Sequence, residues 1–243
     1  MKYIDKRINC AQLDIWKTAM IEANDPNLGY RHPGFPRESV ITALLDAQGN
    51  ICAYTMQRIG PDSCHIEHIK PQTICRCEDE ARREIGEQEL LEEISWGNLL
   101  ACYPAPPKKD QSEPGYGARQ RGSWWDEGKF LSPLCPECEE RIKFSINGSI
   151  SPTDATYIDA VTTIAKMNLG HESLTEQREN AIKSMGLHPL SEDPMSINDA
   201  DLLAKGLWKK RLDDGFMAFC VTLRDAAKLY LQSIERQSDF TAD

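Results

Sequence analysis

Two histidines and a glutamate stand close together in the stretch His65-Ile66-Glu67-His68. A carboxylate beside an imidazole can hold a divalent cation while the imidazole takes a proton from water. Metal-assisted hydrolysis of a phosphodiester needs this division of roles. An imidazole with its ordinary pKa of about 6.5 is largely neutral at physiological pH and can act as a base. We therefore interpret Glu67 as a metal ligand, His65 as a second candidate ligand and His68 as the general base.

The same stretch is predicted to be a β-strand. Strict alternation along a strand sends His65 and Glu67 to one face and His68 to the other. The strand should therefore end or bulge near Glu67, so that Glu67 and His68 reach the same phosphate. The alternative is a strand edge whose histidines lie on the surface without a chemical role, as most isolated histidines do.

The pattern His-x-Glu-His-Ile-x-Pro-Gln, residues 65–72, resembles the first motif of the HNH, or ββα-metal, nucleases. Downstream, Trp96-Gly97-Asn98-Leu99-Leu100-Ala101-Cys102 resembles the middle element of that family. The resemblance implies that Asn98 pins the loop between the strands and orients the base. The last HNH position falls on Glu139 if the pair Cys135 and Cys138 marks it, and Asp126 is the other candidate for this third metal ligand.

A wider resemblance, from about Cys52 to Ile182, is to PtuB-like proteins, the HNH subunits of Septu and related retron anti-phage systems. It is carried by the segments 52–55, 116–118, 130–139, 144–150 and 167–174. It implies assembly with a PtuA-like ATPase and, in retron versions, with a reverse transcriptase and its msDNA. These partners would hold the nuclease inactive until a phage trigger, and the active enzyme would cut tRNA or DNA.

Two further hypotheses remain open beside the nuclease effector. Thr55 stands where many PtuB-like relatives have a second cysteine, and the third ligand is ambiguous. Both departures slightly favour a zinc-knuckle subunit that has lost catalysis and serves assembly alone, whereas the presence of Glu67, His68 and Asn98 opposes it more strongly. A stand-alone HNH restriction or homing nuclease is the other hypothesis, and it would be active without a partner.

Cys135 and Cys138 form a CxxC pair, and the two-residue gap lets both thiolates face one zinc ion. Such a site needs two more ligands. Cys52 and Cys102 stand where the HNH resemblance places zinc cysteines, so we expect a structural Zn²⁺ on these four residues, which would tie the strands to a helix. The alternative is four ordinary buried thiols, a common environment for free cysteine.

Basic and aromatic residues mix in the stretch that holds Arg119, Arg121, Trp124, Trp125 and Lys129. This mixture suits phosphates and stacked bases, and we predict that the three basic residues contact the substrate. The competing interpretation is that the tryptophans only pack over the module.

The net charge of −10 is unusual for a protein that binds nucleic acid unaided, because lysine and arginine supply most of that affinity. Either a local basic lining suffices or a partner presents the substrate. Nine cysteines without a signal-like apolar start predict a reduced, cytoplasmic protein. No window approaches the roughly 20 apolar residues that span a bilayer, so we expect no membrane association.

The elements that must position these residues predict an α+β fold. Its centre is a ββα-metal HNH module at 51–150, and helices flank it on both sides. Apolar residues at helical spacing, Leu13, Trp16 and Met20, predict a first helix, and a second should run from Pro36 to Gly49. We assign 1–50 to packing or partner docking, without chemistry of its own, and 151–243 to a C-terminal helical region.

Overall fold

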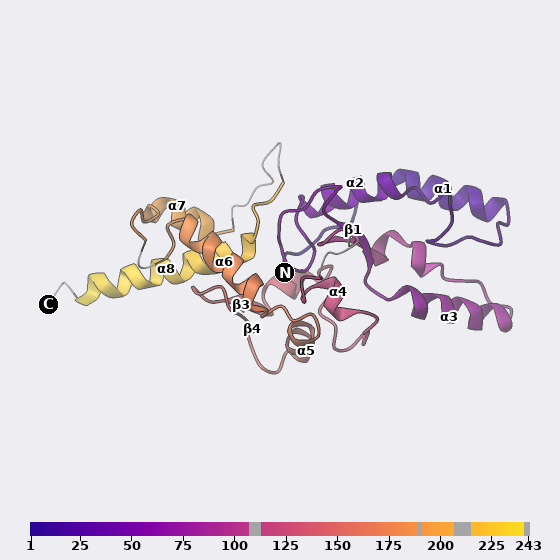
Figure 1. Ribbon diagram of the computed structural model, residues 1–243. Helices are drawn as coiled ribbons and strands as arrows, with labels where there is room; N and C mark the ends of the chain where they lie inside the picture. Colours follow the sequence, from indigo (N-terminus) through magenta and orange to yellow (C-terminus); the bar gives the residue numbers. More distant parts are fainter. Residues whose placement is uncertain (107–112, 189–190, 207–214, 241–243) are drawn as a thin grey trace.

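Helices and two small antiparallel sheets make up the computed structural model, which describes residues 1–106, 113–188, 191–206 and 215–240. The fold is thus a mixture of α and β structure. Figure 1 shows α1, α2, α3 and β1 toward one end of the molecule and α6, α7 and α8 toward the other, with the N-terminus between the two groups.

The first two helices are α1 (Ala11–Glu22) and α2 (Arg37–Gln48), close to the ranges that the apolar spacing predicts. Helix α2 ends at Gly49, whose φ of 61° lies in the left-handed region that glycine tolerates best. The side chain of Gln48 then joins this helix to the neighbouring strand. It accepts from the main-chain N–H of Ala101 at 2.7 Å and donates to the carbonyl of the same residue at 2.8 Å.

Strands β1 (His65–His68) and β2 (Leu99–Cys102) pair antiparallel, with His65 opposite Cys102 and His68 opposite Leu99. Strand β1 ends at His68, one residue after Glu67, so the expected end near Glu67 is confirmed and the register has no bulge. Main-chain pairing continues past the strand, because the Ile69 N–H donates to the Asn98 carbonyl at 2.9 Å. Regular alternation leaves His68 on the buried face of β1.

The connection between β1 and β2 is long and mostly helical. It holds α3 (Gln72–Glu84) and the short 3₁₀ helices η1 (Glu92–Ile94) and η2 (Trp96–Asn98). These elements bring Glu93 and Asn98 back beside the end of β1.

The second half of the chain carries the remaining elements. They are α4 (Ala118–Arg121), η3 (Pro136–Glu139), β3 (Ile142–Phe144), β4 (Ile150–Pro152), α5 (Ile158–Lys166), α6 (Glu172–Ser184), α7 (Ile197–Ala204) and α8 (Cys220–Phe240). Strands β3 and β4 form the second sheet, and α8 packs against α6, α7 and β3. No helix in the described ranges is both long and apolar enough to cross a membrane.

One apolar core includes residues of α1, α2, both sheets and the start of α8. It includes Leu44 of α2, Leu99 of β2, Ile142 of β3 and Val221 of α8. A smaller cluster lies among α6, α7 and α8, around Ile182. The N-terminal helices therefore share a core with the strands that carry the predicted site.

Glu139 joins residues from both ends of the chain. Its carboxylate accepts from Lys2 Nζ at 2.5 Å, from the Tyr3 N–H at 3.0 Å and from Arg224 Nη1 at 2.9 Å. We call these four residues the terminal clasp. Burial alone would raise the pKa of Glu139, but Lys2, the Tyr3 N–H and Arg224 outweigh burial and hold the pKa below its usual value.

Replacing Glu139 with glutamine should make the Tm depend less on pH in the acid range. A lowered carboxylate pKa contributes stability above the unfolded value of 4.5, and this contribution is lost as the pH falls through the folded pKa. Between about pH 4.5 and 3 we expect the Tm of wild type to fall more steeply than that of Glu139→Gln. The control is Glu140→Gln, an exposed neighbour. Identical slopes for wild type and Glu139→Gln would show that the clasp does not stabilise the fold.

Candidate active site

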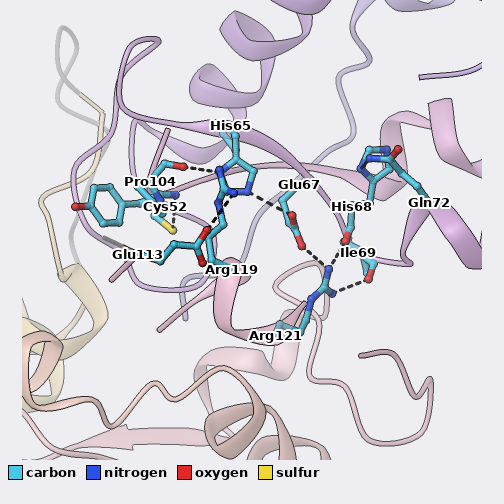
Figure 2. Close-up of polar contacts among 12 residues, drawn as sticks. Cys52, His65, Glu67, His68, Ile69, Gln72, Pro104, Glu113, Arg119 and Arg121 are labelled. Atoms are coloured by element: carbon cyan, nitrogen blue, oxygen red, sulfur yellow. Dashed lines mark hydrogen bonds and ion pairs between the residues drawn. The ribbon is translucent and has the colours of Figure 1, made fainter. Parts of the chain in front are cut away.

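His68 is held as a neutral base at the end of β1. Its Nε2 lies 2.9 Å from the Glu93 carbonyl, which can only accept, so Nε2 carries the hydrogen and Nδ1 keeps its lone pair. The side-chain amide of Gln72 donates a hydrogen bond to Nδ1 at 3.3 Å (Figure 2). The His68 side chain is buried, with 4% of the residue exposed, and burial lowers its pKa to about 4. The imidazole is therefore neutral at physiological pH.

Glu67 is tied to a buried arginine from α4. Its Oε1 accepts from Arg121 Nη2 at 2.5 Å, and the same guanidinium donates to the carbonyls of His68 at 2.5 Å and Ile69 at 2.7 Å (Figure 2). Arg121 is only 5% exposed. The prediction that Arg121 contacts substrate is thus corrected: its guanidinium is occupied by the protein and positions Glu67.

His65 and Glu67 face each other on the other side of β1. His65 Nδ1 lies 2.6 Å from the Pro104 carbonyl and so carries the hydrogen, which leaves Nε2 as an acceptor 3.4 Å from Glu67 Oε2. Two acceptors at this distance suit a shared cation. A histidine ligand commonly donates its other ring nitrogen to a carbonyl, as His65 does here. A Mg²⁺-like ion often takes only one or two protein ligands and completes its shell with water and phosphate.

Neither candidate for the third ligand reaches this pair. Glu139 is occupied in the terminal clasp, on the η3 turn that Lys2 and Arg224 hold, so the predicted metal role does not fit its position. Asp126 pairs with Lys129 at 2.9 Å on the surface. In the part of the chain that the structure describes, no group of three or more histidine, cysteine or acidic side chains is arranged to hold a metal.

Two hollows open beside Glu67. The larger hollow, of about 750 Å³, is lined by His65 and Glu67 together with Tyr30, Arg37 and Arg119. The smaller hollow, of about 280 Å³, is lined by Glu67 and His68 together with Arg31, Arg76 and Arg121. Glu67 thus borders both spaces, although alternation turns it away from His68. Because the smaller hollow has three arginines and one carboxylate, this region is basic in an otherwise acidic protein.

Asn98 connects the end of β1 to the turn that holds the base. Its Oδ1 accepts from the Lys70 N–H at 2.7 Å, and its Nδ2 donates to the carbonyls of Lys70 and Glu92, each at 3.1 Å. The next carbonyl, that of Glu93, is the partner of His68. This geometry is in line with the orienting role that the motif resemblance implies for Asn98.

The four cysteines predicted to bind zinc do not meet at one point. Cys52 and Cys102 are buried neighbours. Burial alone would raise the pKa of Cys52, but hydrogen bonds from the Cys102 thiol, from Thr55 and from the Tyr103 N–H lower it to about 6. Cys135 instead contacts Glu137 at 2.8 Å. The expected four-cysteine Zn²⁺ site therefore does not fit these positions, because the terminal clasp holds the η3 turn elsewhere.

The basic and aromatic stretch that begins in α4 has residues that pack in the core and one residue that lines the site. Trp124 and Trp125 both pack on Phe130, as the packing interpretation expects. Their ring centroids lie 6.1 Å and 5.2 Å from that of Phe130, respectively. Lys129 pairs with Asp126 and lines neither hollow. Arg119 does line the larger hollow, and its side chain is 23% exposed. Of the three predicted substrate contacts, only Arg119 offers an accessible guanidinium.

Sequence reasoning missed the part of the site that comes from the N-terminal segment. The Tyr30 ring packs edge-on against His68 with centroids 4.6 Å apart, and Arg31 and Arg37 line the hollows. Residues 1–50, for which we expect no chemistry, therefore contribute side chains to the border of the candidate site. A signal was present, since Tyr30-Arg31 combines an aromatic with a basic residue in a loop. Nothing local showed that this loop reaches His68.

A scan against protein-family models matches no family along this chain, and a search of curated proteins gives no significant match. Function is therefore inferred from the side-chain geometry together with the motif resemblance.

Proposed function

We propose that this protein is a metal-dependent HNH endonuclease of the PtuB-like kind that hydrolyses phosphodiester bonds of nucleic acid. One observation carries the proposal. The lone pair of a neutral His68 and the carboxylate of Glu67 border one hollow with three arginines around them. A base, a candidate metal ligand and positive charge are the components that phosphodiester hydrolysis requires.

His68 would take the proton of the attacking water on Nδ1, where the water replaces the Gln72 amide as the hydrogen-bond donor. The Glu93 carbonyl keeps the hydrogen on Nε2 and stabilises the imidazolium that forms. Arg121 fixes the Glu67 carboxylate, and Asn98 fixes the turn that carries Glu93. His65 and Glu67 would hold a divalent cation such as Mg²⁺, which would supply charge stabilisation to the phosphate and to the leaving oxygen.

Removal of divalent cations should abolish cleavage. We expect EDTA to stop the reaction and added Mg²⁺ or Mn²⁺ to restore it. His65→Gln should raise the cation concentration needed for half-maximal cleavage by about 10–100-fold, since it weakens one of two protein ligands. His171→Gln, at the start of α6 and outside both hollows, is the matched control. Undiminished cleavage in EDTA would exclude the metal role.

The proposed biological setting follows the PtuB resemblance. In this setting, a PtuA-like ATPase keeps the nuclease inactive in the cytoplasm until infection. In a retron system, a reverse transcriptase and msDNA contribute to the same inhibition. The test is to copurify tagged wild type and His68→Ala from cells that carry the neighbouring genes, and to sequence RNA and DNA ends after phage challenge. New ends in wild type alone would establish the nuclease and distinguish tRNA from DNA. Identical ends in both would count against it.

A catalytically inactive assembly subunit is the second candidate. Two observations favour it: Arg121 already neutralises Glu67, and no third ligand is found among the described residues. Metal-dependent loss of nucleic acid with the purified protein would exclude this role. If cleavage needed no partner at all, the stand-alone restriction or homing nuclease would be favoured over the regulated effector.

A further inference from the structure

We propose that Arg31 and Arg76 bind a backbone phosphate of the nucleic acid next to the phosphate that is cleaved. The place of this contact in the reaction rests on the proposed function, but the binding itself can be tested without cleavage. The two residues come from distant parts of the chain, Arg31 from the loop between α1 and α2 and Arg76 from α3. Both line the smaller hollow with Glu67 and His68.

Neither guanidinium is fully used by the protein. Arg31 is exposed, and among the described residues its guanidinium is attracted to the Glu93 carboxylate without a hydrogen bond to it. Arg76 is 36% exposed at its side chain and uses only Nε, which donates to the Gln72 carbonyl at 3.3 Å and lies 3.9 Å from Glu93 Oε2. The remaining donors of both side chains have the planar geometry that matches a phosphate group.

The other arginines around the two hollows have partners. Arg37 donates to the Tyr30 hydroxyl and stacks over the Tyr30 ring, and Arg119 contacts Glu113 at 3.4 Å. Arg121 is held by Glu67. The positive charge that stays available beside His68 therefore belongs to Arg31 and Arg76.

Glu93 contacts both the base and the segments that carry the two arginines. Its carbonyl accepts from His68, while its carboxylate accepts from the Tyr30 N–H and lies beside Arg76. The loop that carries Arg31 is thus attached to the residue that orients the base. A phosphate bound by Arg31 and Arg76 would hold the nucleic-acid backbone at a fixed position relative to His68 Nδ1.

The test measures binding by full-length protein in EDTA, which prevents metal-dependent cleavage. Fluorescently labelled single-stranded RNA and DNA of one sequence are titrated at several salt concentrations between 50 and 200 mM. We expect Arg31→Gln and Arg76→Gln each to weaken binding by about tenfold. Each should also reduce the slope of log affinity against log salt by about 0.7, the value for one lost phosphate contact with a single strand.

Arg83→Gln is the matched control. Arg83 lies on the same helix, pairs with Glu89 and does not line the smaller hollow. Its affinity and salt slope should stay within twofold of wild type. Weaker binding of both RNA and DNA by the two variants would support a contact to the phosphate that both polymers share. Weaker binding of only one would also support the contact and would show which polymer the protein binds there. Unchanged affinity and slope for both, or no binding by wild type, would overturn the proposal.

The outcome separates this proposal from the nuclease assignment. Protein that binds through Arg31 and Arg76 but never cleaves in Mg²⁺ would refute the nuclease and keep the phosphate site. Protein that cleaves, with binding and salt slope unaffected by both substitutions, would refute the phosphate site alone.

Discussion

Replacing His68 with alanine is expected to lower the rate of cleavage by about 10²–10⁴-fold, the usual contribution of a general base. The reason is the fixed tautomer: with Nε2 bound to the Glu93 carbonyl, Nδ1 is the atom that can accept the proton of water. Cleavage is measured under single-turnover conditions with Mg²⁺ in excess, so that the chemical step and not product release is compared.

Alanine at this position also creates a cavity beside Tyr30. In addition, the Glu93 carbonyl loses the hydrogen-bond donor that His68 provides. Some loss of stability is therefore expected. His68→Gln is the companion variant, because its amide can donate to that carbonyl but cannot act as a base. We expect an equal loss of rate with a smaller fall in Tm. Wild-type cleavage by either variant, when folded at the assay temperature, would exclude His68 as the base.

Replacing Arg121 with methionine is expected to cost about 3–5 kcal/mol of unfolding free energy, the usual result when one partner of a buried ion pair is removed. The variant leaves the Glu67 carboxylate without its buried donor, and the carbonyls of His68 and Ile69 lose theirs as well. For a chain of this size the Tm should fall by roughly 10 °C. Differential scanning calorimetry measures both quantities.

Arg119→Met provides the comparison, because Arg119 sits on the same short helix but has one 3.4 Å contact, with Glu113. Its Tm should stay within about 2 °C of wild type. The double variant Glu67→Gln/Arg121→Met should recover part of the lost stability, since no unpaired carboxylate remains. A Tm for Arg121→Met equal to that of Arg119→Met would show that the buried pair does not organise the site.

Local patterns in the sequence located the elements well. Apolar spacing at Leu13, Trp16 and Met20 predicted α1, and the Pro36 and Gly49 signals delimited α2. These features depend on neighbours within one or two helical turns, so a single sequence contains them. The nuclease assignment itself stays a prediction, because it rests on the motif resemblance and the geometry around His68.

The contacts that complete the site were beyond local reasoning. Arg121 and Arg119 look alike in sequence, yet only Arg121 is buried against a carboxylate 54 positions away. The end or bulge expected near Glu67 assumed that two side chains can share a phosphate only from one face of a strand. In the structure, Glu67 and His68 line one hollow although they alternate along β1. Glu139 was misassigned because its partners, Lys2 and Arg224, lie at opposite ends of the chain.

The terminal clasp also sets an order of events during protein synthesis. The side chains that line the two hollows lie between Tyr30 and Ser123, so the ribosome makes all of them before it makes Glu139. Arg224 follows 85 residues later, which takes roughly 4–17 s at 5–20 residues per second. Throughout that interval the nascent chain contains the residues that line the hollows but lacks Arg224, one of the four residues of the clasp. Synthesis of Arg224, at the start of α8, is thus the step that completes the clasp, long after the residues of the site have been translated.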